Sequence, residues 1–265
     1  MKLLSSRIGL FGLLGLLFLS ASSVHAETAE EYSKRGIIYH RQGNLSQAIS
    51  DFNKAIEINP NLVEAYFNRA LAHEDSGNLG EAIADYNKTI ELAPNFADAY
   101  NNRGLLHSKM AHVNVDTGSE FVVAVRSPDL DNAITDYDRA IKIDNNIADY
   151  YYNRGHAYIF KLNFDQSISD YDKALKINPD FIAAYNSRGL AYGMKHDFDA
   201  AISDFNKAIE SNPKFAEGYC NRAKIYLEKR EYNRSWADVY KAEELGYAIN
   251  PGLIEKLKKA SGREK

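Results

Sequence analysis

Apolar and polar residues along this chain of 265 residues follow a pattern that repeats every 34 residues. Tyrosine occupies the fourth position of each repeat, at Tyr32, Tyr66, Tyr100, Tyr151, Tyr185 and Tyr219. The step from Tyr100 to Tyr151 is 51 residues, so one repeat carries a 17-residue insertion. The repeats run over 29–62, 63–96, 97–147, 148–181, 182–215 and 216–249. A fixed period of this length predicts a stack of similar supersecondary units.

Within each repeat the spacing of apolar residues predicts two helices in close contact. Small residues recur at positions 8, 20 and 27, and position 24 is large, at Phe52, Tyr86, Tyr137, Tyr171, Phe205 and Val239. Large side chains opposite small ones fill the space between packed helices. Proline near the end of four repeats stops the second helix, and Gly43 and Gly77 fit the turn between the helices.

One hairpin cannot bury its apolar face alone, so the six hairpins should stack into one all-α solenoid. The segment 251–260 reads as a capping helix, because Leu253, Ile254 and Leu257 share one face and lysines the other. The insertion, about 111–127, alternates apolar and polar residues over 112–115, turns at Asp116–Ser119 and continues with the apolar run Phe121–Val125, which predicts a β-hairpin in the third repeat. It is either a tolerated elaboration of the loop or a docking element for a partner.

The recurring string Y-x-N-R-G-x-x-Y, followed by A-I-x-D-[YF]-x-K-A-I-x-[IL]-x-P, resembles the tetratricopeptide-repeat family over residues 29–249. Tyrosine stands at the fourth position, where the family usually has tryptophan. The resemblance implies a right-handed superhelix whose first helices line a concave groove that binds peptides or protein surfaces.

An arginine and an aspartate recur in all six repeats. They are Arg35, Arg69, Arg103, Arg154, Arg188 and Arg222 at position 7, and Asp51, Asp85, Asp136, Asp170, Asp204 and Asp238 at position 23. The arginines could form a ligand-binding row. We favour an ion pair between the two helices of each repeat, because equal numbers of opposite charges at a fixed spacing suit pairing.

The resemblance places positions 2, 5, 6, 9, 12 and 13 of each repeat on the concave face. The candidate groove residues are Asn68, Asn102, Asn153, Asn221, Phe67, Leu71, Leu105, Tyr152 and Leu190. The asparagines resemble the ladder with which some long tetratricopeptide superhelices hold a peptide main chain, since an amide both donates and accepts. Asparagine could equally be a common neighbour of the arginine, and the sequence leaves both readings open.

Charge narrows the class of partner. The formal net charge of -4 argues against nucleic acid. The concave positions hold eight acids, Glu30, Glu64, Glu74, Asp75, Asp98, Asp149, Glu217 and Glu228, and four bases, Lys34, Arg41, Lys109 and Lys224. An extended peptide that is neutral or basic is therefore preferred. The basic residues with which some family members clamp the acidic tails of cytosolic chaperones are missing.

The first 26 residues are expected to be a signal peptide. Lys2 and Arg7 precede an apolar run over 8–19, and Val24-His25-Ala26 forms a site of small residues for cleavage. The run is shorter than the ~20 residues of a spanning helix. We expect an exported protein, periplasmic or secreted, without an integral membrane segment after cleavage.

Catalytic signatures are absent from the sequence: H-E-x-x-H, the Walker loop, G-x-S-x-G and C-x-x-C do not occur. His73 and His107 stand where other repeats have a packing tyrosine, so we expect no metal site. Because the catalytic signatures are missing, we also expect no cofactor and no enzyme activity. Cys220 is either a reactive thiol or a small buried hydrophobe. The leading hypothesis is a peptide- or protein-binding scaffold. The alternative is a structural adaptor that self-assembles or joins an envelope complex through its convex face, its insertion or its C-terminal helix.

Overall fold

The computed structural model describes residues 27–113 and 128–263, and these residues form α-helices joined by short turns. The helices are α1 (Ala29–Arg41), α2 (Leu45–Ile58), α3 (Val63–Asp75), α4 (Leu79–Leu92), α5 (Ala97–Val113), α6 (Pro128–Ile143), α7 (Ala148–Phe160), α8 (Phe164–Ile177), α9 (Ile182–Met194), α10 (Phe198–Ser211), α11 (Ala216–Glu228), α12 (Tyr232–Glu244) and α13 (Pro251–Ser261). Each odd helix from α1 to α11 packs antiparallel against the next even one. The predicted all-α solenoid of two-helix repeats is confirmed.

The two helices of a repeat approach closely because glycine faces an aromatic ring. A Cβ atom on Gly189 would lie 2.8 Å from the ring of Phe205, and one on Gly36 would lie 2.7 Å from Phe52. Real Cβ atoms do not come this close to a ring, so the interdigitation of small and large residues sets the spacing of the hairpin. Phe52 and Phe205 are fully buried in these contacts.

The turns inside the first, second, fourth, fifth and sixth hairpins share one backbone conformation. Gly43 and Gly77 both have a φ of 77°, and the equivalent residues Leu162, His196 and Arg230 have φ values of 56°, 60° and 61°. This left-handed region favours glycine. In three repeats a residue with a side chain therefore adopts this left-handed conformation, although the conformation is unfavourable for it.

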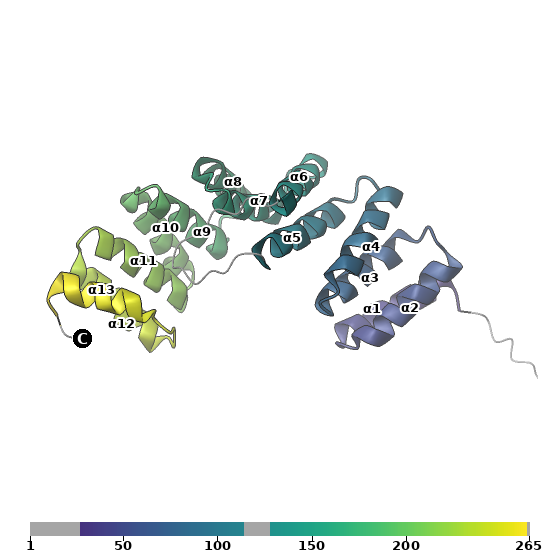
Figure 1. Cartoon of the computed structure of the whole chain (residues 1–265), viewed down its shortest axis with the longest axis horizontal. Coiled ribbons are helices and arrows are strands. Elements are labelled where there is room, and N and C mark those ends of the chain that lie inside the picture. The colour runs from purple at the N-terminus through teal and green to yellow at the C-terminus, as the bar shows by residue number, and fades with distance from the viewer. Residues whose placement is uncertain (1–26, 114–127, 264–265) are drawn as a thin grey trace, which may run out of the picture.

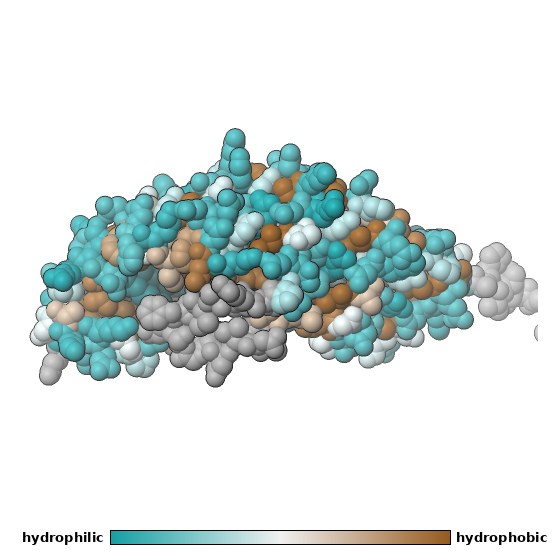
Figure 2. All heavy atoms as spheres, turned by 45° about the horizontal axis from the view of Figure 1, so that its top comes forward, coloured by the Kyte–Doolittle hydropathy of each residue, from teal (hydrophilic) through white to brown (hydrophobic). Residues whose placement is uncertain are grey.

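The repeats curve into an arch. Figure 1 shows α6, α8 and α10 along the outer edge, with α5, α7 and α9 on the inner side. The contacts agree, because α5 touches α7, α7 touches α9 and α9 touches α11. The first helices therefore form the concave face. On the outer side, Figure 2 shows hydrophilic residues over most of the surface with smaller hydrophobic areas between them.

The C-terminal helix α13 covers the last hairpin. Leu253 and Leu257 are buried against Trp236 and Val239 of α12, and Trp236 Nε1 donates to Ser261 Oγ at 3.1 Å. These apolar side chains of α12 would otherwise face solvent, so α13 acts as the predicted cap.

The insertion begins later in the chain than the sequence predicted. The hairpin was predicted from about residue 111, but α5 continues to Val113. The physical reason is that Ala111 is fully buried and packs with Leu130, Ala133 and Tyr137 of α6, which extends the helix by one turn. The rest of the expected hairpin lies in 114–127, outside the described residues.

Candidate binding face

The recurrent arginine joins the two helices of its own repeat. Arg154 donates from Nε to Asp170 Oδ2 at 2.8 Å and from Nη2 to Asp170 Oδ1 at 2.6 Å. The same two-bonded fork is made by Arg35 with Asp51, Arg69 with Asp85, Arg103 with Asp136, Arg188 with Asp204 and Arg222 with Asp238. The six aspartates are buried, so each carboxylate depends on its arginine for hydrogen bonds.

Each of these arginines also reaches a group outside its own hairpin. Nη1 of Arg69, Arg103 and Arg222 donates to Asn53, Asn87 and Asn206, and Nη1 of Arg154 and Arg188 donates to Asp138 and Asp172. In each case the acceptor lies on the second helix of the preceding repeat. Arg35, in the first repeat, donates to Glu27 instead. The arginine therefore connects three helices and two repeats, a role that the periodic pairing alone did not predict.

Burial and charge act in opposite directions on these pairs. Burial raises the pKa of Asp170, while the hydrogen bond and charge of Arg154 act to lower it. Burial lowers the pKa of Arg154, but its bonds to Asp170 and Asp138 outweigh this and raise that pKa above its ordinary value. The net result is a raised pKa for both groups, and the two parallel charge-assisted bonds favour the ionised forms of the pair.

The predicted asparagine row is largely bonded within the protein. Asn68 donates to the carbonyl of Glu64 in its own helix at 2.8 Å. Asn153 donates to Asn101 Oδ1 at 2.9 Å, and Asn101 in turn donates to Asn102 Oδ1 at 3.2 Å. This chain of three amides runs between α5 and α7 near the centre of the arch.

The prediction that Asn221 lines the groove is corrected by the structure, because only 4% of this residue is exposed to solvent. It donates to Asn186 Oδ1 at 3.0 Å, which links α11 to α9. Asn101 and Asn186 both occupy position 5 of their repeats, and sequence reasoning did not single them out. The signal that could have identified them is their spacing: an asparagine at position 5 of one repeat is followed by an asparagine at position 6 of the next repeat, and the two are hydrogen-bonded.

The apolar groove candidates differ in how much of each reaches solvent. Phe67 packs on Phe96 with ring centroids 4.7 Å apart, and Tyr152 packs on Phe181 at 4.9 Å. Leu71 and Leu190 are partly buried in the clusters around Tyr86 and Phe205. Leu105 is 38% exposed. Leu105 is therefore the candidate with the most surface left for a ligand.

Carboxylates dominate the charge of the concave helices. Glu30, Glu64, Asp149 and Glu228 are exposed and make no ion pair within the described chain. Asp98 accepts from Tyr150 Oη at 2.5 Å, and Asp75 contacts His40 Nε2 at 2.7 Å. Burial raises the pKa of Glu74, which also accepts from Tyr86 Oη at 3.3 Å. The unengaged carboxylates give the face a negative field along its length.

Cys220, the candidate reactive thiol, is a packing residue. It is 2% exposed in the cluster with Trp236 and Leu257, and burial raises the pKa of its thiol. Within residues 27–113 and 128–263, no three histidine, cysteine or acidic side chains converge as a metal site would require. No helix in the same residues combines the length and apolarity needed to cross a bilayer.

Comparison with known sequence families gives matches along most of the described chain. A family described as "TPR repeat" matches residues 36–77, 75–110 and 129–159. Families described as "Tetratricopeptide repeat" match 148–181 and 182–215, and 205–237. No curated protein matches this chain.

Solved structures with the same arrangement include the MamA protein, with 30% identity, a TM-score of 0.59, and coverage of 72% of this chain and 95% of MamA. YrrB, described as a TPR protein with an unusual peptide-binding site, shows 20% identity and a TM-score of 0.60, with coverage of 80% and 98%. PilF of Pseudomonas aeruginosa shows 15% identity and a TM-score of 0.68, with coverage of 89% and 97%. The last two are similar in fold alone.

Proposed function

Because this chain belongs to the tetratricopeptide-repeat family, we propose that it is an exported, non-catalytic scaffold whose concave face holds an extended segment of a partner protein. The observation that carries the proposal is the centre of that face, where the exposed side chain of Leu105 lies one helical turn after Asn102 on α5. The amide of Asn102 is joined through Asn101 to that of Asn153 on α7. The peptide binding stated for YrrB supports the proposal by analogy of fold.

The chemistry of this centre suits a main chain with an apolar side chain. Asn153 uses an N–H to reach Asn101, which leaves its carbonyl oxygen as an acceptor. A peptide N–H can donate to it while an apolar side chain covers Leu105. The unpaired carboxylates along the concave face favour a neutral or basic segment, and their effect should fade with salt because the Debye length is about 8–10 Å.

The test is a titration of labelled peptides, one basic and one acidic but otherwise alike, against the mature chain. Leu105→Ser should weaken both peptides by roughly three- to tenfold, because covering a partly exposed leucine contributes about 1 kcal/mol. Asn102→Ala combined with Asn153→Ala should weaken unrelated peptides by similar factors. Asn132→Ala, an exposed asparagine on α6, is the matched control and should change neither.

Equal affinities of wild type and Leu105→Ser for every peptide would rule out this groove. Tighter binding of the acidic peptide would rule out the charge argument while leaving the groove intact. Because the paired asparagine change also removes the bond to Asn101, its thermal unfolding is measured alongside the affinity.

A further inference from the structure

The outer edge of the arch carries a second charged pattern, near the carboxyl ends of the second helices. Position 26 of every repeat is basic: Lys54, Lys88, Arg139, Lys173, Lys207 and Lys241. Position 29 is glutamate in four repeats, at Glu57, Glu91, Glu210 and Glu244, but lysine in the third and fourth, at Lys142 and Lys176. The charge is therefore reversed at the middle of the arch.

In three of the four repeats with glutamate the basic residue pairs with it within its own helix, whereas Lys54 of the first repeat lies over the ring of Tyr32. Lys88 lies 2.6 Å from Glu91, Lys207 lies 3.0 Å from Glu210 and Lys241 lies 2.9 Å from Glu244. Arg139 and Lys142 have no such pair in the described chain. Asp138 is the closest carboxylate along the helix, but it accepts from Arg154 at 2.6 Å, and Asp144 accepts the backbone N–H of Asn146. Both cations are exposed.

A helix end attracts basic residues through its dipole, which offers a simpler account of Lys142. That account does not explain the pattern, because the same position is acidic at the equivalent end of four other helices. The exchange to lysine is thus not required by the helix.

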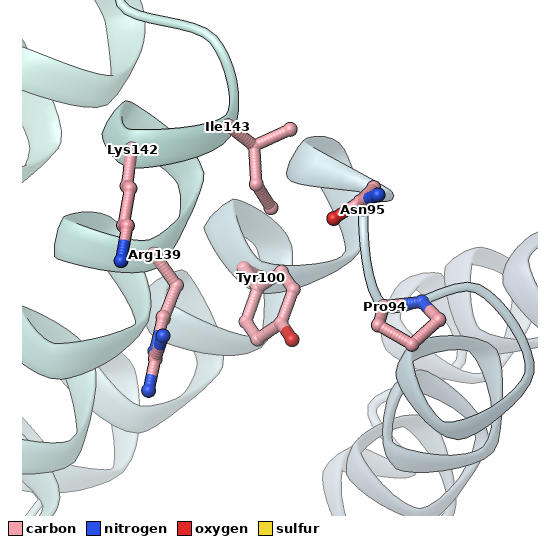
Figure 3. A pocket seen from close by; sticks show the side chains of 6 residues that line it. All are labelled: Pro94, Asn95, Tyr100, Arg139, Lys142 and Ile143. Carbon is pink, nitrogen blue, oxygen red and sulfur yellow. The ribbon is translucent and has the colours of Figure 1, made fainter.

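The two cations border a depression of about 560 Å³ lined by Pro94, Asn95, Tyr100, Arg139, Lys142 and Ile143. Figure 3 shows the Tyr100 ring in the middle, with Arg139 and Lys142 on one side and the turn of Pro94 and Asn95 on the other. Ile143, 36% exposed, supplies an apolar wall.

The tyrosine hydroxyl is free in this repeat. Tyr151 and Tyr219, at the equivalent position, donate to the carbonyls of Asn145 at 3.3 Å and Pro213 at 3.4 Å. Tyr100 makes no hydrogen bond in the described chain. Among the described repeats, the third is the one that combines an unpaired basic couple with a free hydroxyl and a depression between them.

We infer that this depression docks an acidic segment of a partner protein, with two carboxylates on Arg139 and Lys142 and an apolar side chain on Tyr100 and Ile143. Residues three apart on a helix have Cβ atoms about 5–6 Å apart. Alternate residues of an extended strand, at about 3.3 Å per residue, match that spacing and point to the same side. The free hydroxyl of Tyr100 donates to the segment's backbone or to a carboxylate. This surface selects the opposite charge to the concave face and does not depend on the proposed groove.

The probe is a fluorescent hexapeptide of alternating glutamate and leucine, titrated by anisotropy against the mature chain. Lys142→Glu should weaken its binding about tenfold, because the change removes one ion pair and lets Arg139 pair within its own helix. Four other repeats carry glutamate there, so the variant should fold normally. Lys214→Glu makes the same change of net charge at an exposed turn and should alter affinity less than about twofold.

Tyr100→Phe should weaken the peptide a few-fold, whereas Tyr185→Phe, whose hydroxyl also lacks a partner, should not. Leu105→Ser should leave this peptide unaffected, which separates the surface from the groove. Equal losses for Lys142→Glu and Lys214→Glu would overturn the inference, since net charge alone would then explain binding. Full displacement of the peptide by inorganic phosphate at constant ionic strength would also overturn it, in favour of a simple anion site.

Discussion

Removal of one recurrent arginine should destabilise the solenoid strongly. In Arg154→Ala, Asp170 keeps its buried position but loses both of its charge-assisted bonds, and Asp138 loses its contact with the following repeat. The Asp170 side chain is 4% exposed and that of Arg154 is 20% exposed. Removing one partner of a buried pair costs about 3–5 kcal/mol, and the partial exposure of the arginine favours the lower end, about 3 kcal/mol.

Two matched variants separate the parts of this loss. Arg154→Lys keeps the charge but not the fork, so we expect an intermediate cost of about 1–2 kcal/mol. Asp138→Asn installs the amide that Arg69, Arg103 and Arg222 already contact in their repeats, and should cost less than about 0.5 kcal/mol. Urea unfolding followed by circular dichroism at 222 nm gives the free energies of unfolding.

Acid should partly rescue the alanine variant. Without Arg154, burial raises the pKa of Asp170 unopposed, so its folded value lies further above the ordinary aspartate value of about 3.9. A carboxyl with a raised folded pKa contributes stability that is complete below its unfolded pKa and lost as pH rises through the folded pKa. The deficit of the variant relative to wild type should therefore be largest at neutral pH and shrink towards pH ~4.

This reasoning fails if Arg154→Ala unfolds at the same urea concentration as Asp138→Asn, or if its deficit is independent of pH. Normal stability combined with lost peptide affinity would instead assign the arginines to ligand binding.

Two further predictions concern the ends of the chain. Export should remove residues 1–26, so mass spectrometry of the exported protein should find Glu27 at its N-terminus, one residue before the Thr28 and Glu31 capping box of α1; an intact N-terminus in a membrane fraction would disprove cleavage. Leu257→Ala should cost about 2–5 kcal/mol by opening a cavity beside the single tryptophan, Trp236, and should shift its emission to longer wavelength. The exposed Lys259→Ala serves as control, and unchanged emission in Leu257→Ala would mean that α13 does not cover that ring.

The period of the sequence determined the fold because it reports contacts inside one hairpin. Small residues at position 8 meet large ones at position 24, closely in the four repeats with glycine, as at Gly189 and Phe205, and within the same buried cluster in the two with alanine. Arginine and aspartate at a fixed separation likewise meet in all six. Such contacts depend on the local geometry of two joined helices, which is the same in each copy, so a repeated pattern is sufficient to predict them.

Contacts between repeats were decided by the tertiary structure. Nη1 of Arg154 donates to Asp138, and Asn221 donates to Asn186. Both bonds form because the angle between successive hairpins brings those groups together. The extension of α5 to Val113 follows from the packing of Ala111 against α6. Lysine at position 142 was visible in the sequence, but the free hydroxyl of Tyr100 beside it was not. Neighbouring repeats differ in a few residues, and small differences in packing decide which polar groups are bonded internally and which remain available to a partner.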